Sequence, residues 1–211
     1  MNFILSSIIS EKSFISFSYL VAVARTSILS SREVVKVLAL PGAVLHAFLE
    51  HAVCRGAKVV VEDERVVQFN EMLSHVDHQL IKRKGPSFDI CFIPFFVNFM
   101  LGFLTLSYGS TAIIYFAKYE DVVAWICLYF GISLLTNIFP QIEDVMMLKD
   151  NYLVNNDNKL NKALVTPWYG IFWLGARLEK FGLTLFTAIG FAFLVPEILS
   201  WFVPALYNIL K

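Results

Sequence analysis

The sequence has little charge for its length, and long stretches have none. Only 16% of its 211 residues are Asp, Glu, Lys or Arg, whereas 57% are hydrophobic and the mean hydropathy is +0.65. Soluble domains carry about a quarter charged residues. Residues 90–117 and 122–142 contain no Asp, Glu, Lys, Arg or His, and residues 181–210 contain only Glu197. Because a transmembrane helix needs about 20 apolar residues, these runs predict an integral membrane protein.

The sequence also has no net charge and too few cysteines for a disulfide framework. Lys and Arg total 17, as do Asp and Glu, so the formal net charge is zero and gives no indication of a nucleic-acid partner. Two of the three cysteines fall in the apolar runs, which favours small apolar residues over a disulfide framework. The first ten residues lack the basic segment and cleavage site of a signal peptide, so we expect the mature chain to start near Met1.

The apolar runs predict an all-α polytopic membrane protein with about four transmembrane or re-entrant helices. These are expected near residues 34–54, 90–117, 122–148 and 181–208. Residues 1–33 contain Arg25, whose charge at mid-bilayer costs about 2.5 kcal/mol or more. We therefore expect N-terminal interfacial helices there, separate from a single membrane domain over 34–210.

The segments between these helices are more polar. Two β-branched runs around a charged turn predict a small cytoplasmic β-hairpin over 57–69. An Asn-rich stretch predicts a polar loop over 149–167. Residues 52–89 contain six Lys and Arg and residues 149–180 contain five, whereas the short loop between the second and third helices has only Lys118. The positive-inside rule therefore places both basic loops in the cytoplasm, with the side of the N-terminus left open.

Ionisable groups inside apolar segments are the candidates for function. His46 and Glu50 are four positions apart, so they share one helix face and could reach one metal ion. Asp144 would supply a third ligand, since imidazole and carboxylate are usual zinc ligands. The simpler alternatives are a hydrogen bond between His46 and Glu50, and a helix end at Asp144.

Other polar residues have simpler explanations. His75 and His78 lie in a polar segment beside a basic run, where solvated histidines are the expectation and a metal site is the alternative. Asn98 and Asn137 lie within predicted helices, so we expect them to hydrogen-bond to neighbouring helices rather than to touch a substrate.

Several short motifs follow one another along the chain. In order they are Pro41-Gly42, His46, Gly56-Ala-Lys-Val59, Pro94 with Asn98, and Phe139-Pro140 with Asp144. In this order and spacing the sequence resembles small polytopic membrane proteins of the site-2 protease-like, zincin-type metalloprotease superfamily, over roughly residues 37–195. The resemblance implies a zinc site in which His46 matches the first ligand and Asp144 the carboxylate ligand.

The departures from that family lie in the site itself. The catalytic Glu that should follow the first His is Ala47, and the second His is Glu50, with His51 one place late. In that family the Glu takes a proton from the attacking water, which alanine cannot do. His51 is rotated about 100° from Glu50 on a helix, so it would join His46 as a ligand only with local distortion. In that arrangement Glu50 would be the catalytic base.

The sequence therefore predicts a catalytically degenerate, intramembrane metalloprotease-like protein, a pseudoenzyme that binds a membrane protein partner or serves as a subunit of a membrane complex. Its metal, if it has one, is zinc at His46, Glu50 and Asp144. One alternative is an active zinc intramembrane peptidase with an atypical site, and another is a small cation transporter or channel. Ala47 favours the first hypothesis over the second, and the scarcity of charge in the spans disfavours the third. The expected partners are the lipid bilayer and membrane proteins, not nucleic acid.

Overall fold

The computed structural model describes residues 32–61, 76, 78–155, 158–180 and 183–202. The chain divides into two compact units, Met1–Val35 and Lys36–Lys211. The interfacial helices expected over 1–33 lie outside the described residues, apart from the first two residues of α2.

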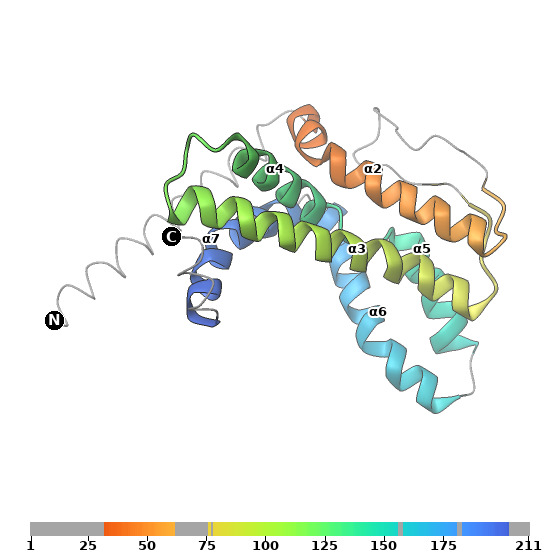
Figure 1. The fold of residues 1–211 in the computed structure, drawn as a ribbon. Coiled ribbons are helices and arrows are strands. Elements are labelled where there is room, and N and C mark those ends of the chain that lie inside the picture. The colour runs from red at the N-terminus through yellow and green to blue at the C-terminus, as the bar shows by residue number, and fades with distance from the viewer. Residues whose placement is uncertain (1–31, 62–75, 77, 156–157, 181–182, 203–211) are drawn as a thin grey trace. The chain divides into compact units, whose positions relative to one another are not determined.

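The described residues form six α-helices with two short π-helical turns and no strand (Figure 1). The fold class is therefore all-α, as predicted. The helices are α2 (Arg32–Gly56), α3 (Lys84–Ser110), α4 (Val122–Thr136), α5 (Ile142–Lys149), α6 (Lys159–Lys180) and α7 (Leu183–Phe202). The π-helical turn η1 (Thr111–Tyr115) extends α3, and η2 (Asp150–Val154) extends α5.

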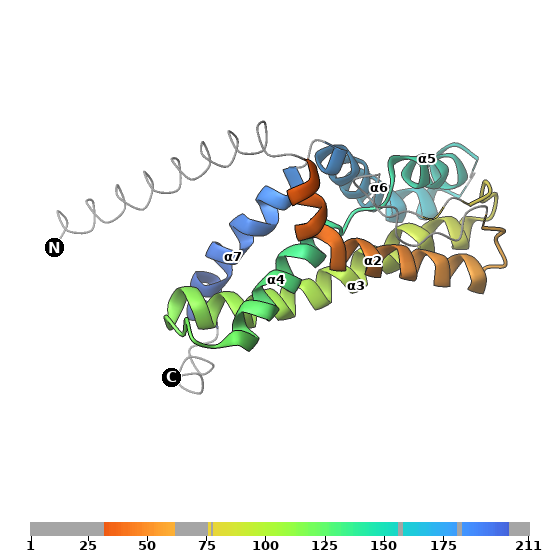
Figure 2. The ribbon, with the colours of Figure 1, turned by 90° about the horizontal axis from the view of Figure 1, so that it is seen from above.

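Helices α3 and α4 pack closely along their lengths (Figure 2). A Cβ at Gly131 would lie 2.6 Å from the backbone of Leu106, and one at Gly109 would lie 2.4 Å from the backbone nitrogen of Leu128. Small residues permit this approach, which is how helices associate where lipid replaces water. Asp121 is the N-cap of α4: its carboxylate accepts hydrogen bonds from the first free N–H groups of that helix.

Helix α2 is joined to the end of α4 by buried polar contacts. Pro41 interrupts the hydrogen-bond ladder of α2, and the following N–H, that of Gly42, donates to Ser133 Oγ at 2.9 Å. Asn137 Nδ2 donates to Ala39 O and to Ser133 O, both at 2.9 Å. These contacts hold the middle of α2 against the point where α4 ends.

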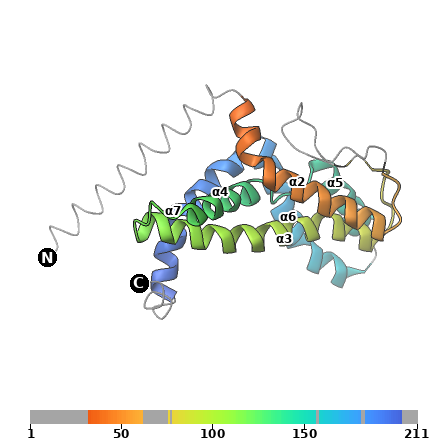
Figure 3. The same ribbon diagram turned by 45° about the horizontal axis from the view of Figure 1, so that its top comes forward.

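The helix predicted over 122–148 is not continuous. Helix α4 ends at Thr136 and α5 begins at Ile142, with Asn137 in a non-helical conformation (Figure 3). Pro140 lacks an N–H and disfavours helical geometry at Phe139, so the chain turns there. The break brings the first turn of α5, which carries Asp144, close to α3.

Two predicted connecting segments also differ from expectation. Within the described part of the predicted hairpin, Val61 forms an isolated antiparallel bridge with His78, not a strand; residues 62–69 lie outside the described residues. The polar loop predicted over 149–167 contains η2 and the first turns of α6. Helix α6 extends over these residues because its apolar residues recur at helical spacing from Leu160 onward.

One described helical span, Lys84–Tyr115, is long and apolar enough to cross a membrane. At 32 residues it measures about 48 Å, more than the roughly 30 Å of a hydrocarbon core. Helices α6 and α7 pass the same test only as one broken span bent by 104°, and α4 is a shorter apolar helix. Among the residues that the structure describes, one or two helices are therefore long and apolar enough to span a bilayer.

Candidate metal centre

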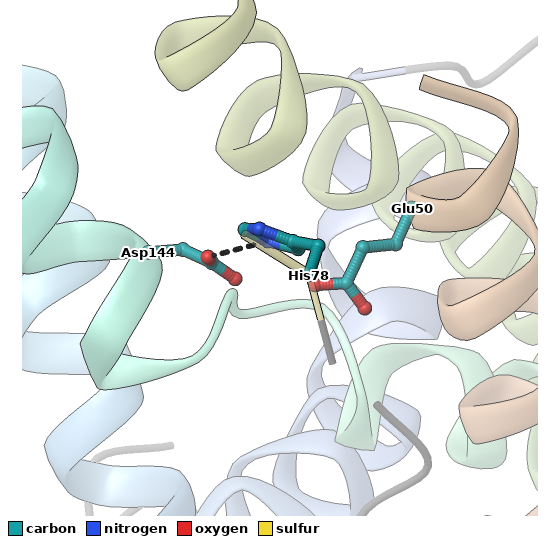
Figure 4. Close-up of side chains that lie close together, drawn as sticks. All are labelled: Glu50, His78 and Asp144. Atoms are coloured by element: carbon teal, nitrogen blue, oxygen red, sulfur yellow. Dashed lines mark hydrogen bonds and ion pairs between the residues drawn. The ribbon is translucent and has the colours of Figure 1, made fainter. Parts of the chain in front are cut away.

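Glu50, His78 and Asp144 come together from three distant parts of the chain (Figure 4). Each offers a ligand atom, and these atoms all lie within 4.8 Å of one another. The His78 imidazole lies between the two carboxylates (Figure 4). Helix α2 supplies Glu50, the segment before α3 supplies His78, and the first turn of α5 supplies Asp144.

His78 is held at both ring nitrogens. Its Nε2 lies 3.0 Å from Asp144 Oδ1, and its Nδ1 lies 3.0 Å from Gln79 O. A carbonyl oxygen only accepts hydrogen bonds, so Nδ1 carries a proton and its N–H fixes the ring orientation. Metal-binding histidines are usually oriented in this way, by a backbone carbonyl on the ring nitrogen that does not face the metal.

The two carboxylates are buried, and both receive electrostatic support. Glu50 is only 2% exposed and Asp144 only 3%. The backbone N–H of Val76 donates to Glu50 Oε2 at 3.3 Å. Asp144 lies in the first turn of α5, where the helix dipole favours negative charge. Two buried carboxylates this close repel each other when both are charged, and a metal ion between them would offset that repulsion.

The elements that carry the three ligands share a hydrophobic cluster. Cys54 of α2, Cys91 of α3 and Val145 of α5 belong to it, together with Ile81, which lies three residues after His78. All four residues are buried. Because the four segments share this cluster, the chain fixes the relative positions of the three ligand-bearing elements without any contribution from a metal.

His46 hydrogen-bonds in a polar network with Asn98 and Asn137. Its Nδ1 lies 2.9 Å from Asn137 O, which also accepts a hydrogen bond from Asn98 Nδ2 at 2.7 Å. Asn98 Nδ2 lies 3.4 Å from His46 Nδ1 as well. The two asparagines thus connect α2, α3 and the end of α4, which confirms the expectation that they hydrogen-bond to neighbouring helices. His46 is 3% exposed.

The structure thus brings together two of the predicted ligands, Glu50 and Asp144. Within the described residues, the group that they form contains His78 and neither His46 nor His51. The ligand roles of His46 and His51 stay predictions. The expectation that His78 is solvated is wrong, since its side chain is only 4% exposed. Its partner in that expectation, His75, lies outside the described residues.

His78 had no periodic signal that could have identified it. It lies in a non-helical segment, so the i, i+4 rule that pairs His46 with Glu50 does not reach it. The available hint was compositional, because all four histidines of the chain lie between positions 46 and 78.

A cavity of about 590 Å³ adjoins the site. His78 and Asp144 form part of its wall, and the rest comes mainly from α5, η2 and the segment before α3. The lining includes the apolar residues Met146 and Met147 and the acidic residues Glu143 and Asp150. The cavity therefore borders the His78 and Asp144 edge of the cluster.

The donor set fits a first-row divalent metal ion. One imidazole nitrogen and two carboxylate oxygens are ligands that zinc accepts, and a site with three protein ligands leaves a further position open. Ligand atoms on a tetrahedral zinc lie about 3.4 Å apart, so the observed limit of 4.8 Å needs only a modest inward movement. A buried group of Glu50, His78 and Asp144 could therefore hold a metal.

No protein-family model, curated protein or solved structure matches this chain. The metalloprotease resemblance therefore stays a prediction.

Proposed function

We propose that this chain is a helical membrane protein with a buried metal site at Glu50, His78 and Asp144, and that it acts by binding a membrane partner rather than by hydrolysis. The observation that carries the proposal is the convergence of the three ligand atoms within 4.8 Å from three separate segments. A buried group of this composition is costly to assemble unless its charges are balanced, and a divalent ion balances the two carboxylates.

The membrane location is supported by the apolar side chains that the described helices leave exposed. On α3 these include Phe96, Met100, Leu101 and Leu104, and Leu104 is 60% exposed. Helices α4 and α7 expose similar residues, among them Ile126, Phe130, Phe193 and Leu194. Exposed apolar patches of this extent mark interaction surfaces in soluble proteins, and on long apolar helices they fit lipid.

The orientation follows from charge. The basic segments 52–89 and 149–180 are proposed to face the cytoplasm. Ile90 and Cys91, early in α3, pack with Val145 of α5 and with Ile81 beside the metal cluster. The metal site would then lie near the cytoplasmic surface of the membrane and not at its midplane.

Loss of peptidase activity is supported by Ala47. Its methyl group is fully buried and has no proton to give or accept, although it stands where the resembled family has its glutamate. A bound zinc would supply Lewis-acid polarisation, but position 47 offers no base. Hence we propose a pseudoenzyme whose metal stabilises the fold and shapes the adjoining cavity for a partner.

A second candidate, an active zinc peptidase with an atypical site, is favoured by one observation. The cavity beside His78 and Asp144 is also lined by Glu143, whose carboxylate is a candidate base in place of position 47. This candidate predicts chelator-sensitive cleavage of a membrane-protein substrate. Glu143→Gln would abolish the cleavage while the metal stays bound.

The deciding experiment measures zinc in the detergent-purified full-length chain by elemental mass spectrometry after zinc loading and dialysis. We expect about one zinc per chain in the wild type. We expect its loss in His78→Ala and in Asp144→Ala. His51→Ala is the matched control, because His51 is the neighbour of Glu50 outside the cluster, and it should keep its zinc.

Two results would overturn this assignment. An absence of zinc in the wild type after loading would remove the metal from the proposal. Retention of zinc in His78→Ala together with its loss in His46→Ala would show that the ligand set is the one predicted from sequence.

A further inference from the structure

Helix α6 exposes an apolar stripe that is not part of the core. Leu160, Leu164, Ile171 and Leu174 are 67%, 62%, 46% and 54% exposed. Their spacings of four, seven and three residues place all four within about 80° of one another on a helix. Removing one such side chain from water stabilises it by about 1.5–3 kcal/mol. An exposed stripe of four therefore indicates a surface that binds lipid or another protein.

A different face of α6 packs against the protein. Val165, Phe172 and Ala176 are buried, and all three belong to the hydrophobic cluster that also contains Cys54, Cys91 and Val145. On a helix these residues centre more than 100° from the exposed stripe. The stripe is therefore not a core face that happens to be poorly covered. Helix α6 therefore has two apolar faces, one packed against the protein core and one exposed.

A basic face lies on the far side of the stripe from the core. Lys159 and Arg177 project about 100° from the stripe, on the side away from Phe172. Lys162 lies about 60° further round the helix, opposite the stripe. The Arg177 guanidinium lies over the Trp173 ring, 5.2 Å from its centroid, a cation–π contact on the side of α6 away from the leucine stripe. Glu179 is the one acidic residue of α6.

We propose that α6 lies in the plane of a membrane surface rich in anionic phospholipid. The leucine stripe enters the boundary of the acyl chains, and the basic flank meets the phosphates. Amphipathic helices that carry Lys and Arg on a polar face and Leu on an apolar face bind membranes in this way. Each basic residue near an anionic surface adds about 1 kcal/mol. The angle of 104° between α6 and α7 fits an in-plane helix followed by a membrane-inserted one.

This inference rests on the membrane location proposed above, and depth measurements can separate the two. The full-length chain, with its native cysteines replaced by alanine, is reconstituted in lipid nanodiscs containing about a third phosphatidylserine, a surface chosen for its negative potential. Spin labels are attached to Leu164→Cys, Leu174→Cys and Thr166→Cys. A fourth label at Leu104→Cys, on α3, reports the membrane location itself. Collisions with oxygen and with a water-soluble nickel chelate give the depth of each label.

We expect the labels at positions 164 and 174 to be oxygen-accessible at shallow acyl depth. The label at Thr166, an exposed residue on the basic flank, should meet the nickel chelate instead. Water-accessible labels at 164 and 174 beside a buried label at 104 would overturn the α6 inference alone. Labels at 164 and 174 that neither reagent reaches would also overturn it, because a protein partner would then cover the stripe. A water-accessible label at 104 would overturn both proposals.

The charge requirement has its own test. The triple variant Lys159→Gln, Lys162→Gln, Arg177→Gln should move the label at Leu174→Cys to a shallower depth in anionic nanodiscs. In nanodiscs of phosphatidylcholine alone, the triple variant and its parent should give the same depth. Equal depths in both lipids for the parent chain would show that anionic headgroups are not recognised.

Discussion

His78 Nε2 lies 3.0 Å from Asp144 Oδ1, although 66 positions of sequence separate the two residues. Both side chains are about 95% buried, and the contact ties the segment before α3 to the first turn of α5. Glu50 approaches the same imidazole from α2. The contact between His78 and Asp144 therefore joins two segments of the fold as well as bringing two ligands together.

Removal of that imidazole should be costly even without metal. His78→Ala leaves two buried carboxylates facing each other, and breaking a buried ion pair costs about 3–5 kcal/mol. Thermal unfolding of the metal-free protein in detergent should show a clear drop in the midpoint. The double variant His78→Ala, Asp144→Asn should recover part of the loss because it also removes one negative charge. Equal stability of the single and double variants would mean that like-charge repulsion is absent at the site.

Gly42 is a position where a single methyl group should not fit. A Cβ there would lie 2.1 Å from Ser133 O and 2.9 Å from Asn137 Nδ2. Gly42→Ala should therefore separate α2 from α4 and destabilise the protein by about 3 kcal/mol, as measured by thermal unfolding. Gly170→Ala on α6 is the control, since nothing lies within 4 Å of its Cβ position. The control should be neutral or slightly more stable, because alanine favours helix by about 1 kcal/mol.

The all-α class was predictable from the sequence because long apolar runs are a strong local signal for helices. Runs without charge over residues 90–117 and 122–142 are long enough to cross a bilayer as helices, which satisfy their backbone groups internally. The break between Thr136 and Ile142 was harder to see, because Pro140 is compatible with either a kink or a full stop. Asn137 supports the stop, because its side chain donates to Ala39 O of α2, a contact that depends on the folded arrangement.

The candidate site was predictable only in part, for the same reason. Glu50 and Asp144 attract attention as carboxylates next to apolar runs. His46 attracts attention through its helical spacing from Glu50, yet its Nδ1 faces the carbonyl of Asn137. His78 belongs to the candidate site but lies in a non-helical segment. The position of that segment is fixed by its bridge to Val61 and by the burial of Ile81. Neither the bridge nor the burial of Ile81 can be predicted from the spacing of apolar residues along the sequence.

The start of α4 depends on one capping residue. Asp121 Oδ1 accepts hydrogen bonds from the N–H groups of Val123 and Ala124 at 3.0 and 3.2 Å. Asp121→Ala should cost about 1 kcal/mol in the free energy of unfolding, whereas Asp121→Asn should keep most of the cap. Glu120→Ala is the matched control, because Glu120 is an exposed neighbour outside the helix. A loss of the same size in the control would mean that charge in the turn matters, and not the cap.

The α3–α4 hairpin makes the proposed topology testable from both sides of a membrane. If α3 and α4 cross together, Glu120 at their connection and Asn155 after η2 lie on opposite sides, with Asn155 in the cytoplasm. In a chain whose native cysteines are replaced by alanine, Glu120→Cys should react with an impermeant maleimide from outside intact cells. Asn155→Cys should react only after the membrane is opened. Both positions are exposed, so burial does not mask them. Reaction of both cysteines from the same side would mean that α4, at 15 residues and about 22 Å, does not complete a crossing and that the pair is re-entrant.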